Sequence, residues 1–233
     1  MRISAKDISV SYNKKDRIIK VPDKVSFEPV SGEVTVINGR SGSGKTTLIN
    51  VLAGILLPTE GRVYYDETDI YQISDEKLSA FRCENIGYIP QGASALANLT
   101  VMQNILLPSA LAGKDNVKFA EELLEMVGLE KLKNAYPDEL SGGELRRLAA
   151  ARALINSPSV IFADEPTNDL DDENASLILE LLKAQAEKGA AVIIVTHDIK
   201  AQAYADTLYR MDGGKLQSYG ISAKEKEDIY DTA

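Results

Sequence analysis

The stretch Val34-Thr-Val-Ile-Asn-Gly-Arg-Ser-Gly-Ser-Gly-Lys-Thr46 decides the fold. Its apolar strand, Val34–Ile37, runs into a glycine-rich loop that fits the pattern G-x-x-x-x-G-K-[ST]. A helix follows, because apolar residues recur at helical spacing between Leu48 and Leu52. This succession of strand, loop and helix predicts an α/β core that binds a phosphorylated nucleotide.

Each residue type in the loop has a chemical task. Glycines let backbone N–H groups converge on phosphate oxygens, and the N-terminus of the following helix adds a favourable dipole. Lys45 offsets charge on the β- and γ-phosphates, and the Thr46 hydroxyl can bind Mg²⁺. A chance glycine-rich turn is disfavoured by the strand before the loop and the helix after it. We therefore expect the nucleotide to be bound by Gly39, Arg40, Ser41, Gly42, Ser43, Gly44, Lys45, Thr46 and Thr47.

The composition is that of an ordinary globular protein, with 44% hydrophobic and 26% charged residues. The length of 233 residues suits one α/β domain, or one core with a small inserted subdomain. The net charge of −9 argues against a nucleic-acid partner, because phosphate backbones are held by clustered Lys and Arg side chains. We expect no nucleic acid among the partners.

Several features bear on the cellular compartment. The start of the chain lacks a secretory pattern, and the longest apolar runs, Val51–Leu57 and Ala190–Val195, are too short to span a bilayer. The single cysteine, Cys83, excludes an intramolecular disulfide and a cysteine-based metal site. We expect a protein of the reducing cytoplasm, in which Cys83 is a small hydrophobic residue and not a reactive thiol.

Alternation of strand and helix signals predicts one nucleotide-binding core interrupted by a helical insert. The first 38 residues read as strands of an antiparallel entry sheet, and residues 91–157 read as helical. We assign 1–90 and 158–221 to the core with its β subdomain, 91–157 to the insert and 222–233 to a charged, loosely held tail. Further strands are expected at Val63–Tyr65, Ile86–Ile89, Val160–Ala163 and Ala191–Thr196, with a helix at Asn174–Lys188.

Polar side chains follow three of these apolar strands, where open α/β sheets place their ligands. Asp164 and Glu165 end one strand: we expect Asp164 to hold Mg²⁺, and Glu165, pointing to the opposite side of an extended chain, to activate water. His197, the chain's one histidine, can donate to a γ-phosphate oxygen, and Gln91 can reach the metal or the water. Taken singly, each of these residues has a structural explanation, but their place beyond the phosphate loop favours catalysis.

A second anion site is expected at Leu140-Ser-Gly-Gly-Glu144, which precedes another apolar helix. Ser141 is a plausible N-cap, and Gly142 and Gly143 expose backbone donors. A capped surface helix is the alternative. Because the loop at Gly39–Thr46 already surrounds the phosphates from one side, a second phosphate-binding loop on a distant insert suggests that it serves another subunit's nucleotide.

Over nearly its whole length the chain resembles the ATPases of ABC transporters. The resemblance rests on seven motifs in the family's order. They are the adenine-stacking aromatic Tyr12, the Walker A loop Gly39–Thr47, Q-loop Gln91, the signature Leu140–Glu144, the Walker B strand to Asp164 with catalytic Glu165, the D-loop Asn168–Asp171 and the switch His197, with Arg147 and Arg152 also in place.

The resemblance implies a P-loop NTPase (RecA-like) core with an N-terminal antiparallel β subdomain and an inserted helical subdomain. It implies ATP hydrolysis with Mg²⁺ in a head-to-tail homodimer, where two ATP molecules lie between one chain's Walker A loop and the other's signature. Tyr12 would stack on adenine, and Ser141, Gly142 and Gly143 would contact the partner's nucleotide. The partner in transport would be a separate permease, which holds the ATPase peripherally on the inner face of the cell membrane.

Three segments are most similar to the lipoprotein-releasing, macrolide-export and antimicrobial-peptide-resistance group: Leu78–Arg82, Ile86–Gln91 and Leu99–Asn104. At four positions the chain departs from the pattern, with Gly92 for an aromatic, Ala97 for a proline, and Leu145 and Arg146 for glutamines. We expect the last two to change surface contacts more than ATP chemistry. The alternatives are a non-transport ABC ATPase acting on DNA or ribosomes, and a nucleotide-binding regulator without turnover, which the presence of Glu165 and His197 disfavours.

Overall fold

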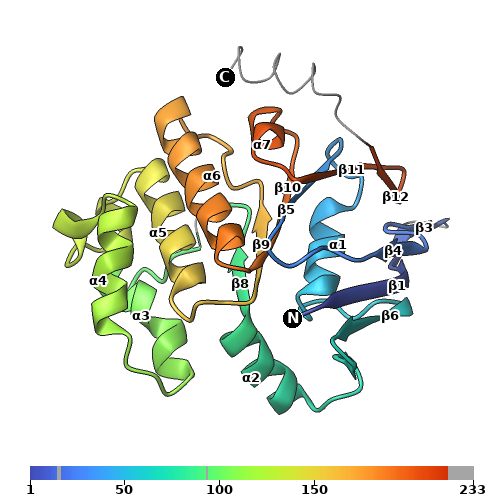
Figure 1. Ribbon diagram of the computed structural model, residues 1–233, viewed down its shortest axis with the longest axis horizontal. Helices are drawn as coiled ribbons and strands as arrows, with labels where there is room; N and C mark the ends of the chain where they lie inside the picture. Colours follow the sequence, from blue (N-terminus) through green and yellow to red (C-terminus); the bar gives the residue numbers. More distant parts are fainter. Residues whose placement is uncertain (15–16, 93, 220–233) are drawn as a thin grey trace.

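A six-stranded sheet forms the centre of the molecule in the computed structural model, which describes residues 1–14, 17–92 and 94–219 (Figure 1). The strand order is β12-β11-β5-β10-β9-β8, and all neighbouring pairs are parallel except β11 and β12. The strands are β5 (Val34–Asn38), β8 (Ile86–Ile89), β9 (Val160–Asp164), β10 (Ala191–Thr196), β11 (Thr207–Asp212) and β12 (Lys215–Ser218). The phosphate-binding loop therefore follows an interior strand, β5.

A second, antiparallel sheet has the order β4-β1-β6-β7. It comprises β1 (Ile3–Ser9), β4 (Val25–Phe27), β6 (Glu60–Tyr65) and β7 (Thr68–Asp69), while β2 (Ser11–Lys14) and β3 (Arg17–Lys20) form a separate hairpin. The expectation that all strands of the first 38 residues share one antiparallel sheet is wrong. The strand β5 pairs in parallel with β10 and β11, because its first four residues are buried, and the apolar Val34, Val36 and Ile37 suit the middle of a parallel sheet covered on both faces.

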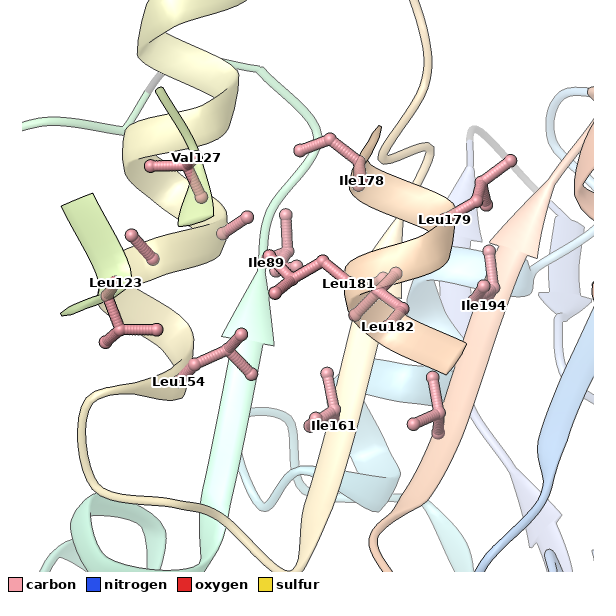
Figure 2. Close-up of a cluster of buried hydrophobic side chains, with 14 of the residues drawn as sticks. Ile89, Leu123, Val127, Leu154, Ile161, Ile178, Leu179, Leu181, Leu182 and Ile194 are labelled. Carbon is pink, nitrogen blue, oxygen red and sulfur yellow. The ribbon is translucent and has the colours of Figure 1, made fainter. Parts of the chain in front are cut away.

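Two hydrophobic cores lie on opposite faces of the parallel sheet, as the period of two along a strand requires. On β10, Ile193 and Val195 face helix α1 (Lys45–Leu52) and the antiparallel sheet, whereas Val192 and Ile194 face the other helices. Figure 2 shows this second core, in which Ile161 and Ile194 of the sheet belong to one cluster with Leu182 of α6 (Asp172–Glu187). Packing on both faces holds the carboxyl ends of the strands rigidly at one edge.

The segment between β8 and β9 is helical, as the sequence predicts. It contains α3 (Val101–Leu111), α4 (Val117–Met126) and α5 (Gly142–Leu154), with short 3-10 turns at Glu130–Leu132 and Pro137–Glu139. Figure 1 places these helices together on the side of the molecule away from α1. Within the described part of the chain, no helix is long and apolar enough to cross a membrane.

The sequence patterns did not predict the helices α2 (Asp75–Asn85) and α7 (Lys200–Ala203) or the strands β2, β7, β11 and β12. Helix α2 buries a single side chain, Leu78, so it lacks the apolar periodicity that marks a helix in sequence. Its start is fixed by the side chain of Ser74, which accepts a hydrogen bond from the Lys77 N–H. The expected tail, 222–233, lies outside the described residues, and the division into core, insert and tail stays a prediction.

Candidate nucleotide-binding and hydrolysis site

The glycine-rich loop has a backbone that only glycine adopts without strain. Gly42 and Gly44 have φ angles of 77° and 104°, in the left-handed region. At Gly39 the restriction is steric, since a Cβ atom would lie 2.3 Å from the Met211 carbonyl oxygen. Gly44 is the N-cap of α1 and offers no side-chain acceptor, so the first-turn N–H groups of α1 are open to an anion.

Two buried polar side chains of the loop suit a phosphate. Lys45 is 6% exposed, and its Nζ donates to the Gly39 carbonyl at 2.6 Å and lies 3.6 Å from Glu165 Oε1. The buried Ser43 Oγ has no hydrogen-bond partner among the described residues. A buried hydroxyl in this position requires a partner, and phosphate oxygens beside the loop can supply it.

A cavity of about 670 Å³ opens over the loop. Its lining brings together most of the predicted ligands: Arg40–Thr47, Tyr12, Gln91, Glu165 and His197. Ile19 and Val21 also line the cavity and were missed, although Ile19 pairs with Tyr12 across the β2–β3 hairpin and therefore shares its face. Tyr12 is 45% exposed, and its hydroxyl shares a 3.3 Å hydrogen bond with Thr47 Oγ1.

Asp164 lies at the end of β9, below the cavity lining, and is 1% exposed. Its Oδ1 atom has no hydrogen-bond partner among the described residues. Burial raises the pKa of Asp164, and the Thr46 hydroxyl and Lys45 partly offset the increase. An orphaned carboxylate oxygen beside a threonine hydroxyl fits Mg²⁺, which takes oxygen ligands from one or two protein groups and completes its shell with phosphate and water.

Glu165 has a φ angle of 47°, so the expectation that it follows Asp164 on an extended chain is wrong. The left-handed turn brings its Oε2 atom to 3.0 Å from His197 Nδ1 and 2.8 Å from the donating Thr196 hydroxyl. Burial raises the pKa of Glu165, but the hydrogen bonds from His197 and Thr196 outweigh it and leave the pKa below its ordinary value. The carboxylate is therefore ionised at neutral pH and able to accept a proton.

Thr196 is a contact that motif reading missed. It is fully buried, donates to Glu165 and accepts a 2.9 Å hydrogen bond from the Asp198 N–H. Its position could have indicated this role, because Thr196 is the last residue of β10 and directly precedes His197.

The signature loop begins α5 as predicted. Ser141 is the N-cap, and its hydroxyl accepts from the Glu144 N–H, while Glu144 accepts from the Ser141 N–H at 2.7 Å. None of the residues from Leu140 to Glu144 lines the cavity of its own chain. The D-loop residue Asp171 caps the following helix, α6.

One expectation for α5 is wrong. Arg146 is not a surface residue, because it is 6% exposed and donates to backbone carbonyls next to Gln91. By contrast Arg147, where the resemblance expects an arginine, donates to the side chain of Asn174 on α6.

Comparison with known proteins gives a consistent result. The ABC transporter family model matches residues 22–168. The ABC transporter ATP-binding protein YtrE of Bacillus subtilis is 37% identical over 224 residues, covering 94% of this chain and 96% of that protein. The lipoprotein-releasing system ATP-binding protein LolD of Buchnera aphidicola is 37% identical over 214 residues, with 90% and 93% coverage.

Solved structures are similar as well. The dimeric post-hydrolysis state of the ATP-binding cassette MJ0796, bound to ADP and Pi, has a TM-score of 0.87 and 32% identity, covering 94% of this chain and 100% of that one. This likeness confirms the predicted P-loop NTPase fold class. With Arg40–Thr47, Gln91, Glu165 and His197 assembled around one cavity, the chain belongs to the ABC transporter family and is an ATP-binding and ATP-hydrolysing subunit of that family.

Proposed function

We propose that this chain binds ATP and Mg²⁺, pairs head to tail with a second copy around two ATP molecules, and drives a separate membrane permease. The observation that carries the proposal is the separation of two anion-binding loops. Lys45 and Glu165 meet in one cavity, whereas the loop at Ser141 lies outside it. One chain therefore offers a phosphate-binding loop with its cavity, which we call the cradle (Arg40–Thr47 and Glu165), and a separate loop at Ser141 that can complete the cradle of another chain.

In the cradle, the loop amides and Lys45 hold the β- and γ-phosphates, while Tyr12 stacks on the base. Thr46, Asp164 and Gln91 would hold Mg²⁺. When bound, the ion would draw charge from the phosphate oxygens. Its protein ligands come from three elements that meet at one sheet edge, so the site is fixed by the fold.

Hydrolysis needs a base near the γ-phosphate, and Glu165 is placed for that role. Its carboxylate lies 3.6 Å from Lys45 Nζ and is oriented by Thr196 and His197. Glu165 accepts the proton of the attacking water, and His197, whose side chain is 65% exposed, lines the same cavity and orients the Glu165 carboxylate. The Lys45 ammonium offsets negative charge as the phosphate leaves.

Head-to-tail pairing would complete the site. Gly142 and Gly143 are open, since no described atom lies within 4 Å of a Cβ on Gly142, and the closest on Gly143 is 3.6 Å away. The N-terminus of α5 can thus approach an anion held by another chain. The named relatives are ATP-binding proteins of transporters, which supports a permease partner and a place on the inner face of the cell membrane.

The relatives named as lipoprotein-releasing proteins support an export or mechanotransmission role. Relatives named as putative hemin import ATP-binding proteins are 36% identical to this chain, so the direction of transport belongs to the permease. Action on DNA or ribosomes is not favoured, because the chain carries a net charge of −9 and one cassette.

A mixing experiment tests the shared site. Lys45→Ala damages the cradle and Ser141→Arg damages the signature loop, so each homodimer has two defective sites. In the heterodimer both lesions fall in one site and the other is intact. We expect the mixture to recover hydrolysis that neither variant shows alone. Absence of recovery, in a mixture shown to contain heterodimer, contradicts head-to-tail pairing with independent sites.

A further inference from the structure

A buried arginine links the signature helix to the loop that carries Gln91. Arg146 stands on the first turns of α5, and its Nη1 atom donates to the carbonyl oxygens of Pro90 at 3.0 Å and Gly92 at 3.5 Å. These two carbonyls flank Gln91, whose side chain lines the nucleotide cavity. The guanidinium therefore hydrogen-bonds to the backbone on both sides of Gln91.

Close packing of α5 on the edge strand β8 makes this reach possible. A Cβ atom on Gly87 would lie 2.6 Å from the Ala153 carbonyl oxygen, so the strand approaches the last turn of α5 directly. The helix runs back along the strand from there, which brings Arg146 to the strand's end. From the same helix, Arg152 donates to the Ser94 carbonyl oxygen at 2.9 Å, and thus holds the loop further along.

The positive charge of Arg146 is stabilised by carboxylates at the carboxyl ends of the sheet strands. Burial lowers the pKa of its guanidinium, whereas the carboxylates of Asp169, Asp164 and Glu165 raise it. Buried ions persist where they are paired and hydrogen-bonded. The guanidinium thus lies in the field of the catalytic acids as well as on the Gln91 backbone.

We propose that Arg146 is a positioning residue that couples the signature helix to Gln91. The two hydrogen bonds fix the backbone at 90–92 to α5, so that any displacement of α5 when it engages a partner's nucleotide moves Gln91 relative to Lys45 and Glu165. The inference rests on the proposed role of Gln91 in ATP hydrolysis. A glutamine at position 146, which the family resemblance leads one to expect, is shorter than arginine and carries no charge, so it would reach these carbonyls less well and donate more weakly.

A double-mutant cycle on the full-length protein tests the coupling. Arg146→Met keeps an unbranched side chain and removes the donors. We expect kcat for ATP hydrolysis to fall about tenfold or more, within the roughly 10²-fold that a misplacement of about 1 Å can cost, with KM for ATP little changed. Arg146→Lys, which keeps one cationic donor, should restore part of the loss.

In a Gln91→Ala background, Arg146→Met should change kcat by less than about twofold, because there is no side chain left to position. Arg147→Met is the matched control: it alters the next arginine of the same helix, which contacts Asn174 and not the 90–92 backbone. The factor by which Arg147→Met lowers kcat should be the same in the wild-type and Gln91→Ala backgrounds. If Arg146→Met does not fold, Arg146→Gln enters the same cycle.

Equal fold-losses for Arg146→Met in both backgrounds, or wild-type kcat in the single variant, overturn the proposal. A second readout does not depend on activity: hydrogen exchange at the Gln91 and Gly92 amides should become faster in Arg146→Met while exchange in α1 stays the same. Unchanged exchange at these two amides also overturns the proposal. Failure of the proposed function is distinguishable from failure of this inference. It would appear as unchanged turnover in Glu165→Gln, a variant in which both arginines are intact.

Discussion

The two loops that begin α1 and α5 both present a helix N-terminus to an anion, but they differ in how they are completed. Before α1, Gly44 supplies no side-chain cap, and Lys45 and Ser43 are buried beside the open donors. Before α5, Ser141 and Glu144 cap each other, and both side chains lie at the surface or near it. The first loop leaves its N–H donors open beside buried polar side chains of the same chain, whereas the side chains of the second loop already hydrogen-bond to each other.

In our proposal, this difference makes ATP binding and ATP hydrolysis depend on different surfaces of the chain. Binding would need the phosphate loop and its cavity, which one chain completes, whereas hydrolysis would need Glu165 and the signature loop of a second chain. Variants of the two loops should therefore separate affinity from turnover.

The largest expected effect is on turnover. Glu165→Gln keeps the size of the side chain and removes the base, so phosphate release should fall by a factor on the order of 10²–10⁴. ATP affinity should be retained, because the loop amides and Lys45 are unchanged. Phosphate-release kinetics and equilibrium ATP binding measure the two quantities, and wild-type turnover in the variant would remove Glu165 from its role.

Affinity for nucleotide should separate the two loops directly. Lys45→Ala removes a charged donor to phosphate, which we expect to weaken ATP binding by roughly 1.5–3 kcal/mol, about 10- to 150-fold in Kd. Ser141→Arg should leave the Kd of the monomer unchanged and abolish turnover. Titration calorimetry at protein concentrations below dimerisation measures both; equal weakening in the two variants would show that the loops are not distinct.

Where the cavity would hold adenine, Tyr12→Ala should weaken ATP binding by about 1–3 kcal/mol if the ring stacks as aromatic side chains do on single-stranded bases. Tyr12→Phe keeps the ring and loses only the 3.3 Å contact to Thr47, so its affinity should be near that of the wild type. Calorimetric titration of the three proteins decides the matter, and equal affinities would exclude stacking.

The smallest effect concerns the capped loop. Ser141→Ala removes the N-cap of α5 and should lower the free energy of unfolding by roughly 0.5–2 kcal/mol. Ser141→Thr is the control, because threonine keeps the hydroxyl that accepts from the Glu144 N–H and donates to the Glu144 carboxylate, and should keep stability. Urea unfolding measures the change in both variants, and a common loss of stability would contradict the capping account.

Much of the site follows from sequence because its chemistry depends on short local patterns. The loop residues, Glu165, His197 and Gln91 were all predicted, and they line one cavity. Their meeting follows from a general rule, since parallel strands end at the same edge.

What sequence could not provide depends on contacts between distant segments. The order of strands in the sheet is not the order in the chain, so β5 was assigned to the wrong sheet. Ile19 reaches the cavity only through the register of a hairpin. Arg146 appears polar and exposed in a linear pattern, but α5 lies so close to Gly87 that the side chain is enclosed and meets the Gln91 loop.

The central claim, that a second chain completes the site, is tested most directly by the mass of Glu165→Gln in solution with and without ATP. Light scattering should show a monomer without nucleotide and a dimer with saturating ATP and Mg²⁺, because the variant binds ATP and does not hydrolyse it. Adding Ser141→Arg to the same chain should abolish the dimer. A Glu165→Gln protein that stays monomeric with ATP and Mg²⁺, and is not paired by its permease, would contradict the head-to-tail account.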